Sequence, residues 1–277
     1  MKPLTIMVAP NGARRMPSDH ANLPITIEAT ARVCAEVHAG GAQAVHVHVR
    51  DAQGLHTLDA DLYKQASLAI RREAGDDLVL QITTEAVGRF TPAEQIATVR
   101  AVRPEAVSIA LKELIPDEAA IAEGAEFYAW AHREGMAVQH ILYSVEETER
   151  FVSLVARGVL PGERHSVIFP LGRYATGQES SPAELIPLLA CLDRHGQLDR
   201  TDWMVCAFGR AETPSLVAAA ALGGECRIGF ENSFFNADGS RAESNAERLE
   251  DLRRGLAGVP RPRANRDDAL RALGRPF

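Results

Sequence analysis

The sequence has few features of a secreted, membrane-spanning or nucleic-acid-binding protein. Its four cysteines never form a C-x-x-C pair, so we expect reduced, mostly buried thiols and no zinc knuckle. No window approaches the roughly 18 apolar residues of a membrane span, and the N-terminus lacks the apolar core of a signal peptide. The 30 basic and 37 acidic residues form no long block of one sign, which argues against a nucleic-acid or anionic-membrane surface. These absences predict a soluble, cytoplasmic protein with neither kind of partner.

Short apolar runs of strand length are abundant instead, and they alternate with longer helical stretches. This alternation is typical of repeated β-α units around a parallel sheet. Eight such runs occupy residues 4–9, 43–49, 77–83, 106–111, 136–142, 165–170, 203–208 and 226–230. Eight units in about 250 residues predict an α/β fold of the (β/α)8 TIM-barrel type.

Helix start signals separate several of these runs. They are Thr26, Thr91-Pro92, Ser181-Pro182 and Thr213-Pro214. No linker divides the chain, so we expect residues 1–277 to form a single TIM-barrel domain. Residues from about 258 to 277 are expected to be a C-terminal extension with a short helix in DDALRALG, packed either on the barrel or on a neighbouring subunit.

Side-chain alternation along the strands predicts which residues face the barrel interior. In the second run, Val45, Val47 and Val49 suit helix packing, which turns His46 and His48 inward. The same reasoning places further residues at or near the C-terminal ends of the strands, where TIM barrels carry their active sites. They are Arg50, Gln81, Thr83, Glu85, Ser108, Lys112, Arg227 and Glu231.

His46, His48 and Glu231 form a potential metal site. Two residues at i and i+2 of a strand lie roughly 6.5–7 Å apart at Cα, so both imidazoles can reach one ion. Two histidines and a carboxylate, with a position left for water or substrate, are the ligands of a catalytic zinc site. Zinc is our first expectation, and iron or manganese also suits this set. The alternative is that both histidines only form hydrogen bonds inside the barrel.

The remaining histidines carry less information. Those on predicted helices or in loops are expected to be solvated or capping side chains. They are His20, His38, His56, His132 and His195. His140 falls late in the fifth run, and with inward parity it would contact substrate or metal-bound water.

Two segments of the sequence resemble those of a known family. VHVHVRD (45–51) and ALGGECRIGFEN (221–232), followed by the terminal DDALRALG, are similar to the β-keto acid cleavage enzymes, which include 3-keto-5-aminohexanoate cleavage enzyme. The resemblance runs in order over nearly the whole chain. It implies a zinc-dependent TIM barrel, often tetrameric, that converts a β-keto acid and acetyl-CoA into acetoacetate and a new acyl-CoA.

The resemblance also implies roles for individual residues. The family's zinc ligands fall on His46, His48 and Glu231, and its catalytic arginine falls on Arg227. Its substrate-contacting hydroxyls fall on Thr83 or Thr84 and near Ser108.

The sequence departs from the family's pattern in several places. Asn232 replaces an aspartate associated with proton abstraction, and an amide cannot act as a base. Glu85 replaces a glycine, and Lys112-Glu113 replaces part of an Asn-Phe-Gly turn. Arg14 stands about where the aminohexanoate enzyme has an acidic residue for its cationic amine. A neutral or anionic substrate side chain is therefore expected.

Glu85 is the preferred replacement base, with Glu113 and His140 as alternatives. Arg227 would stabilise developing oxyanions, unless it forms only a structural ion pair. The chain contains neither G-x-G-x-x-G after a strand nor a Walker-type loop. We therefore expect loop arginines such as Arg173 and Arg210 to bind the CoA phosphates.

Two other functions remain open at this point. The first is a zinc-dependent aldolase or hydrolase that acts on an oxo acid without CoA. The second is a catalytically silent barrel that binds a small acid or metal, an option that Asn232 keeps open. Fold alone does not choose among these functions.

Overall fold

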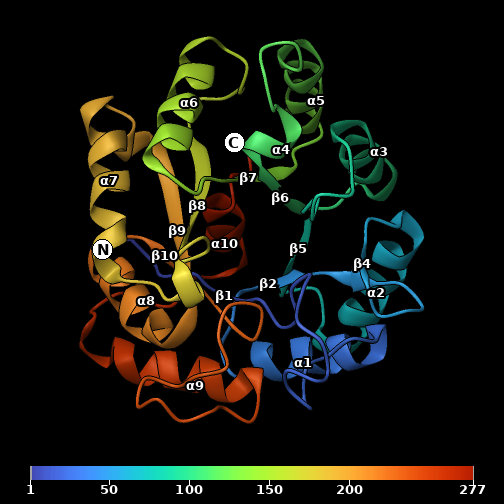
Figure 1. Cartoon of the computed structure of the whole chain (residues 1–277), viewed down its shortest axis with the longest axis vertical. Helices are drawn as coiled ribbons and strands as arrows, with labels where there is room; N and C mark the ends of the chain where they lie inside the picture. Colours follow the sequence, from blue (N-terminus) through green and yellow to red (C-terminus); the bar gives the residue numbers. More distant parts are fainter. Residues whose placement is uncertain (1, 277) are drawn as a thin grey trace.

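A closed barrel of eight parallel strands, surrounded by helices, forms the centre of the protein (Figure 1). The structure is a computed structural model that describes residues 2–276. The barrel strands are β1 (Ile6–Val8), β2 (Ala44–Val47), β5 (Val79–Thr83), β6 (Ala106–Ala110), β7 (Ala137–Ile141), β8 (His165–Leu171), β9 (Thr201–Ala207) and β10 (Glu225–Ile228). β1 pairs with both β2 and β10, which closes the barrel. The predicted TIM barrel and its eight strands are confirmed.

Helices follow the strands, and all but the last of them form the outer layer. They are α1 (Ile27–Ala39), α2 (Ala60–Ala74), α3 (Pro92–Val102), α4 (Leu111–Leu114), α5 (Ile121–Arg133), α6 (Val145–Ala156), α7 (Leu185–Arg194), α8 (Glu212–Ala221), α9 (Asn245–Gly255) and α10 (Arg266–Ala272). Thr26 caps α1 and Thr91 forms a capping box with Glu94, as their positions predict. α8 begins at Glu212, so the start predicted at Thr213-Pro214 is slightly late.

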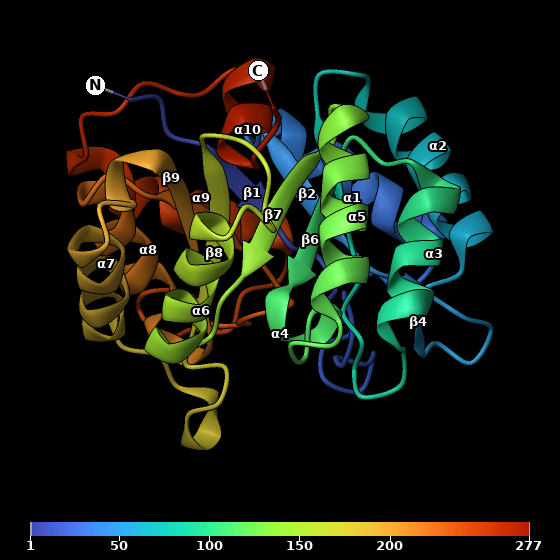
Figure 2. The same ribbon diagram turned by 90° about the horizontal axis from the view of Figure 1, so that it is seen from above.

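α10 closes the N-terminal end of the barrel (Figure 2). Its Ala269 and Leu270, with Leu273 just beyond it, belong to the apolar cluster that fills the barrel interior. The Ser166 hydroxyl of β8 donates a hydrogen bond to the Ala272 carbonyl at 2.6 Å. Of the two packing arrangements left open for this helix, the structure has the one on the barrel.

β7 is where the predicted parity is wrong. Gln139, and not His140, faces the interior, where its amide contacts Gln81. The His140 ring packs outside the barrel against Tyr128 and Phe151, with ring centroids 5.2 and 5.4 Å away. His140 therefore cannot contact substrate or act as a base at the barrel mouth.

A short antiparallel hairpin follows β2 and was not predicted. It pairs β3 (Val49–Arg50) with β4 (His56–Thr57). The Arg50 guanidinium donates to the carbonyls of Gly12 and Arg15 at 2.5 and 3.0 Å. Arg50 thus fastens the loop after β1 to the hairpin.

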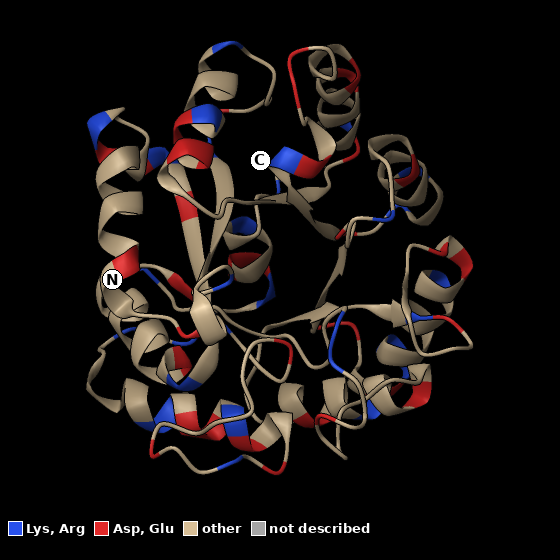
Figure 3. Cartoon of the chain, viewed as in Figure 1, with Lys and Arg blue, Asp and Glu red and all other residues tan. Residues whose placement is uncertain are grey.

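Charged residues of both signs are interspersed around the ring of helices (Figure 3). No helix within the described residues 2–276 is long and apolar enough to cross a membrane.

Candidate active site

His46, His48 and Glu231 meet at the C-terminal end of the barrel. The Nε2 atoms of the two histidines lie 3.1 Å apart. Glu231 Oε2 lies 3.7 Å from His46 Nε2 and 3.4 Å from His48 Nε2. Both histidines are almost fully buried, with 1% and 2% exposure. β2 and β10 therefore bring these three residues together, as the sequence predicts.

A chain of hydrogen bonds along the barrel interior fixes the tautomer of His46. It starts at the Ala272 carbonyl, which can only accept, so the Ser166 hydroxyl must donate to it. Gln139 then donates to Ser166 at 3.2 Å, and Gln81 donates to Gln139 at 3.2 Å. The Gln81 carbonyl oxygen is left to accept from His46 Nδ1 at 2.7 Å. His46 therefore carries its proton on Nδ1 and a lone pair on Nε2.

His56 fixes the tautomer of His48 in the same way. His56 Nε2 donates to the Glu85 carbonyl at 2.9 Å, so its Nδ1 carries a lone pair. His48 Nδ1 lies 3.4 Å from this atom and donates to it, which leaves a lone pair on His48 Nε2. His56 is buried, so the prediction of a solvated loop side chain is wrong.

The resulting donor set suits a metal cation. Two lone pairs face each other at 3.1 Å with no proton between them, and Glu231 Oε2 has no hydrogen-bond partner among residues 2–276. Burial lowers the pKa of His46 to about 3, with Arg227 adding to this effect, so the ring is neutral at pH 7. Ligand atoms around tetrahedral zinc lie about 3.3 Å apart for bonds of about 2.05 Å. The three measured separations bracket that value.

Glu231 is held in a tight loop after β10. Its backbone N–H donates to the Ala9 carbonyl at 3.1 Å. Gly12 has φ +65°, and a Cβ there would lie 2.5 Å from Glu231 Cγ, so only glycine fits. The carboxylate's second oxygen accepts from Arg227 Nη2 at 3.1 Å. Burial alone would raise the pKa of Glu231, but Arg227 and the two histidines outweigh it and hold this pKa well below its usual value.

Glu85 lies beside this centre, between two arginines. Its Oε1 is 3.8 Å from Arg14 Nε and 3.7 Å from Arg173 Nη2, and its Oε2 is 4.0 Å from His48 Nδ1. Arg14 and Arg173 therefore join the site, as their loop positions suggested.

Two adjoining hollows open at the mouth and share Glu85, Arg173, Phe208 and Glu231. The outer hollow has a volume of about 120 Å³. The inner one also contacts His46, Thr83 and Arg227. Larger hollows lie elsewhere on the protein, so cavity size alone would not locate this site.

Several residues at the mouth were not identified from the sequence. Phe208, Ile141, Tyr143 and Pro170 line the inner hollow. Burial raises the pKa of Tyr143 well above its usual value, so its hydroxyl stays protonated. The first three belong to ordinary apolar runs or strand ends, which carry no signal of their own. Asn11 also escaped notice, although its amide exchanges hydrogen bonds with the His48 backbone at 3.0 and 3.2 Å.

Other residues predicted for the site lie around it without lining either hollow. Thr84 and Ser108 are buried, and the Thr84 hydroxyl donates to the Ser108 carbonyl at 3.4 Å. Lys112 donates to Glu147 at 3.0 Å. Asn232 is fully buried, and its side-chain amide has no partner within residues 2–276.

Two further residues have other contacts. Glu113 accepts from the Ala86 N–H at 2.9 Å. Arg210 donates to the Gly239 carbonyl at 3.2 Å and stacks over Phe235.

Comparison with known proteins finds similarity over almost the entire chain. The model of the beta-keto acid cleavage enzyme family matches residues 3–274. The chain is 25% identical over 279 residues to 3-keto-5-aminohexanoate cleavage enzyme of Acetoanaerobium sticklandii, covering 99% of each protein. It is 24% identical over 285 residues to 3,5-dioxohexanoate:acetyl-CoA acetone transferase of Paraburkholderia graminis, covering 92% of this chain and 90% of that protein.

Among solved structures, the fold is similar to that of ObcA in its apo form. The TM-score is 0.71 at 14% sequence identity, and the match covers 92% of this chain. The chain spans 66% of the length of ObcA. At this identity the likeness concerns the barrel fold alone.

Proposed function

The chain belongs to the beta-keto acid cleavage enzyme family, and on that premise we propose that it cleaves a β-keto acid with acetyl-CoA as second substrate, giving acetoacetate and a new acyl-CoA. The two curated relatives are named for a keto-acid cleavage and for a transfer that uses acetyl-CoA. Both match this chain over most of their length, which supports the same class of reaction here.

The observation that carries the proposal is the 3.1 Å approach of the His46 and His48 Nε2 atoms beside a Glu231 oxygen that has no hydrogen-bond partner among residues 2–276. His46, His48 and Glu231 would hold a divalent metal ion, with zinc as first choice and iron or manganese as other options. When bound, such an ion acts as a Lewis acid that polarises a ketone and acidifies the neighbouring carbon.

Arg227 is the proposed stabiliser of developing negative charge. Its Nη2 is occupied by Glu231 and by the Cys206 sulfur at 3.2 Å, whereas its buried Nε has no partner among residues 2–276. A buried, fixed cation with an unpaired donor suits an oxyanion. The ion pair with Glu231 is therefore compatible with a catalytic role for Arg227.

Glu85 is the proposed base that removes the α-proton. Its carboxylate borders both hollows and lies 3.8 Å from Arg14 Nε and 3.7 Å from Arg173 Nη2. Asn232 lacks a basic lone pair and would only form hydrogen bonds.

The proposed bond changes balance without a further reactant. The α-carbon loses a proton to Glu85 and bonds to the acetyl carbonyl carbon, and the C–S bond of acetyl-CoA breaks. The released thiolate adds to the original ketone carbon. The bond between that carbon and the α-carbon then breaks, and the proton returns to the α-carbon. The products are acetoacetate and an acyl-CoA that carries the original side chain.

The mouth suggests the substrate class. Arg14 and Arg173 would bind beside a neutral or anionic substrate side chain, or would donate to the CoA phosphates. Arg210, which lies outside these hollows, is a further candidate for the phosphates. Thr83 lines the inner hollow, and its hydroxyl would donate to the substrate carboxylate. Thr84, Ser108 and Lys112 are the other proposed substrate contacts.

Three further properties complete the proposal. The chain forms a single domain with residues 258–277 as its extension, it works in the cytoplasm, and it assembles as a homodimer or homotetramer. The shared interior cluster of barrel and α10 supports the first. Sedimentation velocity tests the last, and a monomer at micromolar concentration would contradict it.

The experiment is an assay of the zinc-loaded protein on a panel of β-keto acids, with and without acetyl-CoA. We expect a new acyl-CoA and acetoacetate only when the thioester is present. Consumption of a keto acid without acetyl-CoA would indicate an aldolase or hydrolase. No turnover on any member, with metal bound, would favour a non-catalytic barrel.

A further inference from the structure

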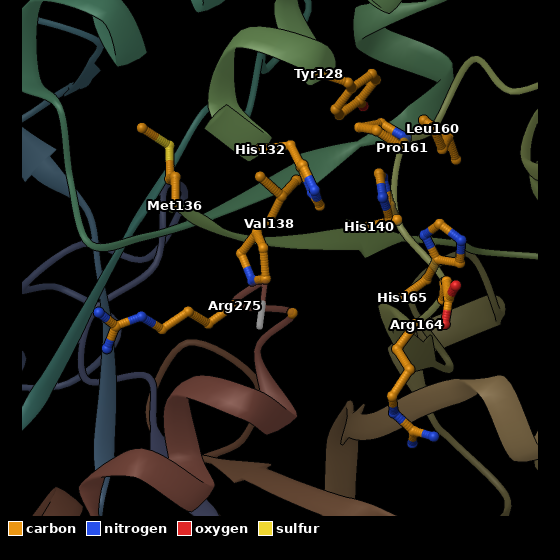
Figure 4. A pocket seen from close by; sticks show the side chains of 14 residues that line it. Tyr128, His132, Met136, Val138, His140, Leu160, Pro161, Arg164, His165 and Arg275 are labelled. Atoms are coloured by element: carbon orange, nitrogen blue, oxygen red, sulfur yellow. The ribbon is translucent and has the colours of Figure 1, made fainter. Parts of the chain in front are cut away.

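Buried polar side chains outside the proposed chemistry differ in how they are bonded. Beside a hollow of about 370 Å³ on the outer side of the barrel wall, His140 and His165 pack among aromatic rings (Figure 4). Their unpaired nitrogen atoms are buried, so a molecule in that hollow would not reach them. Asn11 and Asn245 are buried as well, at 0% and 2% exposure, but each bonds to backbone groups through both ends of its amide.

β1 ends before the strands on its two sides reach the proposed metal ligands. Its last ladder position, Val8, pairs with β2 on one side and with β10 on the other. At the same register, residue 11 would lie level with both His48 and Glu231. These two residues follow the ends of β2 and β10, so strand pairing does not fix their separation.

The Asn11 side chain takes the place of a ladder partner for His48. Its Oδ1 accepts from the His48 N–H at 3.2 Å, and its Nδ2 donates to the His48 carbonyl at 3.0 Å. An amide presents a donor and an acceptor on neighbouring atoms, whereas a carboxylate only accepts and a hydroxyl has a single oxygen for both. Asn11 therefore holds the backbone from which the His48 imidazole projects.

Asn245, at the start of α9, holds the turn that carries Glu231. Its Oδ1 accepts from the Phe230 N–H at 2.9 Å, and its Nδ2 donates to the Pro10 carbonyl at 3.1 Å. Pro10 immediately precedes Asn11. The loop after β1 is thus tied to the backbone beside each of these two proposed ligands.

We propose that Asn11 and Asn245 are positioning residues that set the distance between His48 Nε2 and Glu231 Oε2, which is 3.4 Å. Neither side chain lines the hollows at the mouth, and each acts through the backbone. The inference rests on the proposed function, because it concerns the metal centre of that site.

The test compares the single variants Asn11→Ala and Asn245→Ala with the original full chain. Competition with a chromophoric chelator measures zinc affinity, and the visible absorption of cobalt-loaded protein reports how the ligands are arranged. Gln43→Ala is the matched control. Gln43 is also a buried amide bonded to backbone, but it accepts from the Ile6 N–H at 2.9 Å, at the start of β1.

We expect each asparagine variant to lose about 10- to 100-fold in zinc affinity, the usual effect of altering groups that orient metal ligands. The cobalt absorption should change in the same variants. Gln43→Ala should lower the Tm but leave zinc affinity and the cobalt spectrum as in the original chain, because a purely structural loss does not move the ligands.

Unchanged zinc affinity and cobalt absorption in the asparagine variants would overturn the proposal, as would an equal loss of affinity in Gln43→Ala. Asn11 and Asn245 lie on different elements, so if one variant does not fold, the other decides. Turnover of the original chain is assayed separately. The predicted losses of affinity without any turnover would support the positioning role and contradict the proposed reaction, whereas no zinc binding by the original chain would overturn both.

Discussion

At the scale of single residues, the site is defined by where two protons lie. Gln81 and His56 each hold a histidine proton on Nδ1, so both Nε2 atoms present lone pairs to the same point. Partners of this kind orient metal-binding histidines and raise their basicity. The arrangement is unfavourable without a cation, because two acceptors then face each other in a buried site.

Metal binding should therefore stabilise the fold. At a free zinc concentration 100 times the Kd, linkage predicts about 2.7 kcal/mol, which raises the Tm of a chain of this size by several degrees. Calorimetry of metal-free and zinc-loaded protein checks this. Glu231→Gln should largely abolish the increase. An unchanged Tm of the original chain at saturating zinc would contradict the proposed site.

Glu85→Gln tests the proposed base. We expect turnover to fall by about 10²–10⁴-fold, the usual contribution of a general base, with zinc content unchanged. Glu113→Gln is a matched control, since Glu113 accepts from the Ala86 backbone and does not line the hollows. If Glu85→Gln keeps full turnover, another group removes the proton.

His140 gives a prediction about pH. Burial, and then the neighbouring His165, lowers the pKa of His140 in the folded chain to about 3, below the usual histidine value of about 6.5. As the pH falls below about 6.5, the unfolded chain takes up this proton first. The contribution of neutral His140 to the free energy of unfolding is therefore complete above about pH 6.5. As the pH falls further toward the folded pKa, this free energy declines by about 1.4 kcal/mol per pH unit.

Chemical denaturation of zinc-loaded protein between pH 7 and pH 5 measures this decline. His140→Leu should reduce the slope of the free energy of unfolding against pH by the equivalent of about one proton. His195→Leu, which alters an exposed histidine, should not. An equal pH slope in wild type and His140→Leu would contradict the assignment.

At the scale of elements, most of the barrel could be predicted from the sequence. Residues 45–50 read VHVHVR and alternate strictly between apolar and polar side chains, so the inward face of β2 was identified correctly. The same held for Arg227 on β10. These predictions succeeded because one face of each strand carries polar groups that the helix layer would not accept.

The errors have equally specific causes. β7 reads AVQHI, with a polar residue on each face, so alternation alone does not decide between Gln139 and His140. Strands of parallel barrels are buried on both sides, which weakens the pattern further. His56 was missed because its role depends on the hairpin that folds it back onto His48, a contact with no local sequence signal.

The interior chain of hydrogen bonds links α10 to the proposed metal site. Ser166→Ala removes the hydroxyl acceptor of the Gln139 amide and leaves it only the weak Met204 sulfur at 3.9 Å, which loosens the orientation of Gln81 and His46. We expect zinc affinity to fall by about 10-fold or more, the usual effect of altering partners of metal ligands.

Zinc competition with a chromophoric chelator measures that affinity. Ser215→Ala is the matched control, because Ser215 is an equally buried hydroxyl with no partner among residues 2–276. Equal zinc affinity in Ser166→Ala and the original chain would show that the interior chain does not influence the site.

At the scale of the whole molecule, the two ends of the barrel differ in structure. α10 seals the N-terminal end, and the polar groups of His46, Arg227 and Glu231 occupy the C-terminal end. The chain carries a net charge of −7, yet four arginines and only three acidic residues line the mouth. The positive charge of the mouth comes from Arg14, Arg15, Arg173 and Arg227. Arg50 and Lys112, also predicted near the strand ends, have other partners.

The most direct test of the central claim is the fate of a labelled acetyl group. The zinc-loaded protein is given ¹³C-acetyl-CoA and an unlabelled β-keto acid, and the products are identified by mass spectrometry. The account predicts acetoacetate that carries the labelled acetyl group and an unlabelled acyl-CoA built from the keto acid. Acetyl-CoA left intact while the keto acid is consumed, or label appearing in the new acyl-CoA, would contradict it.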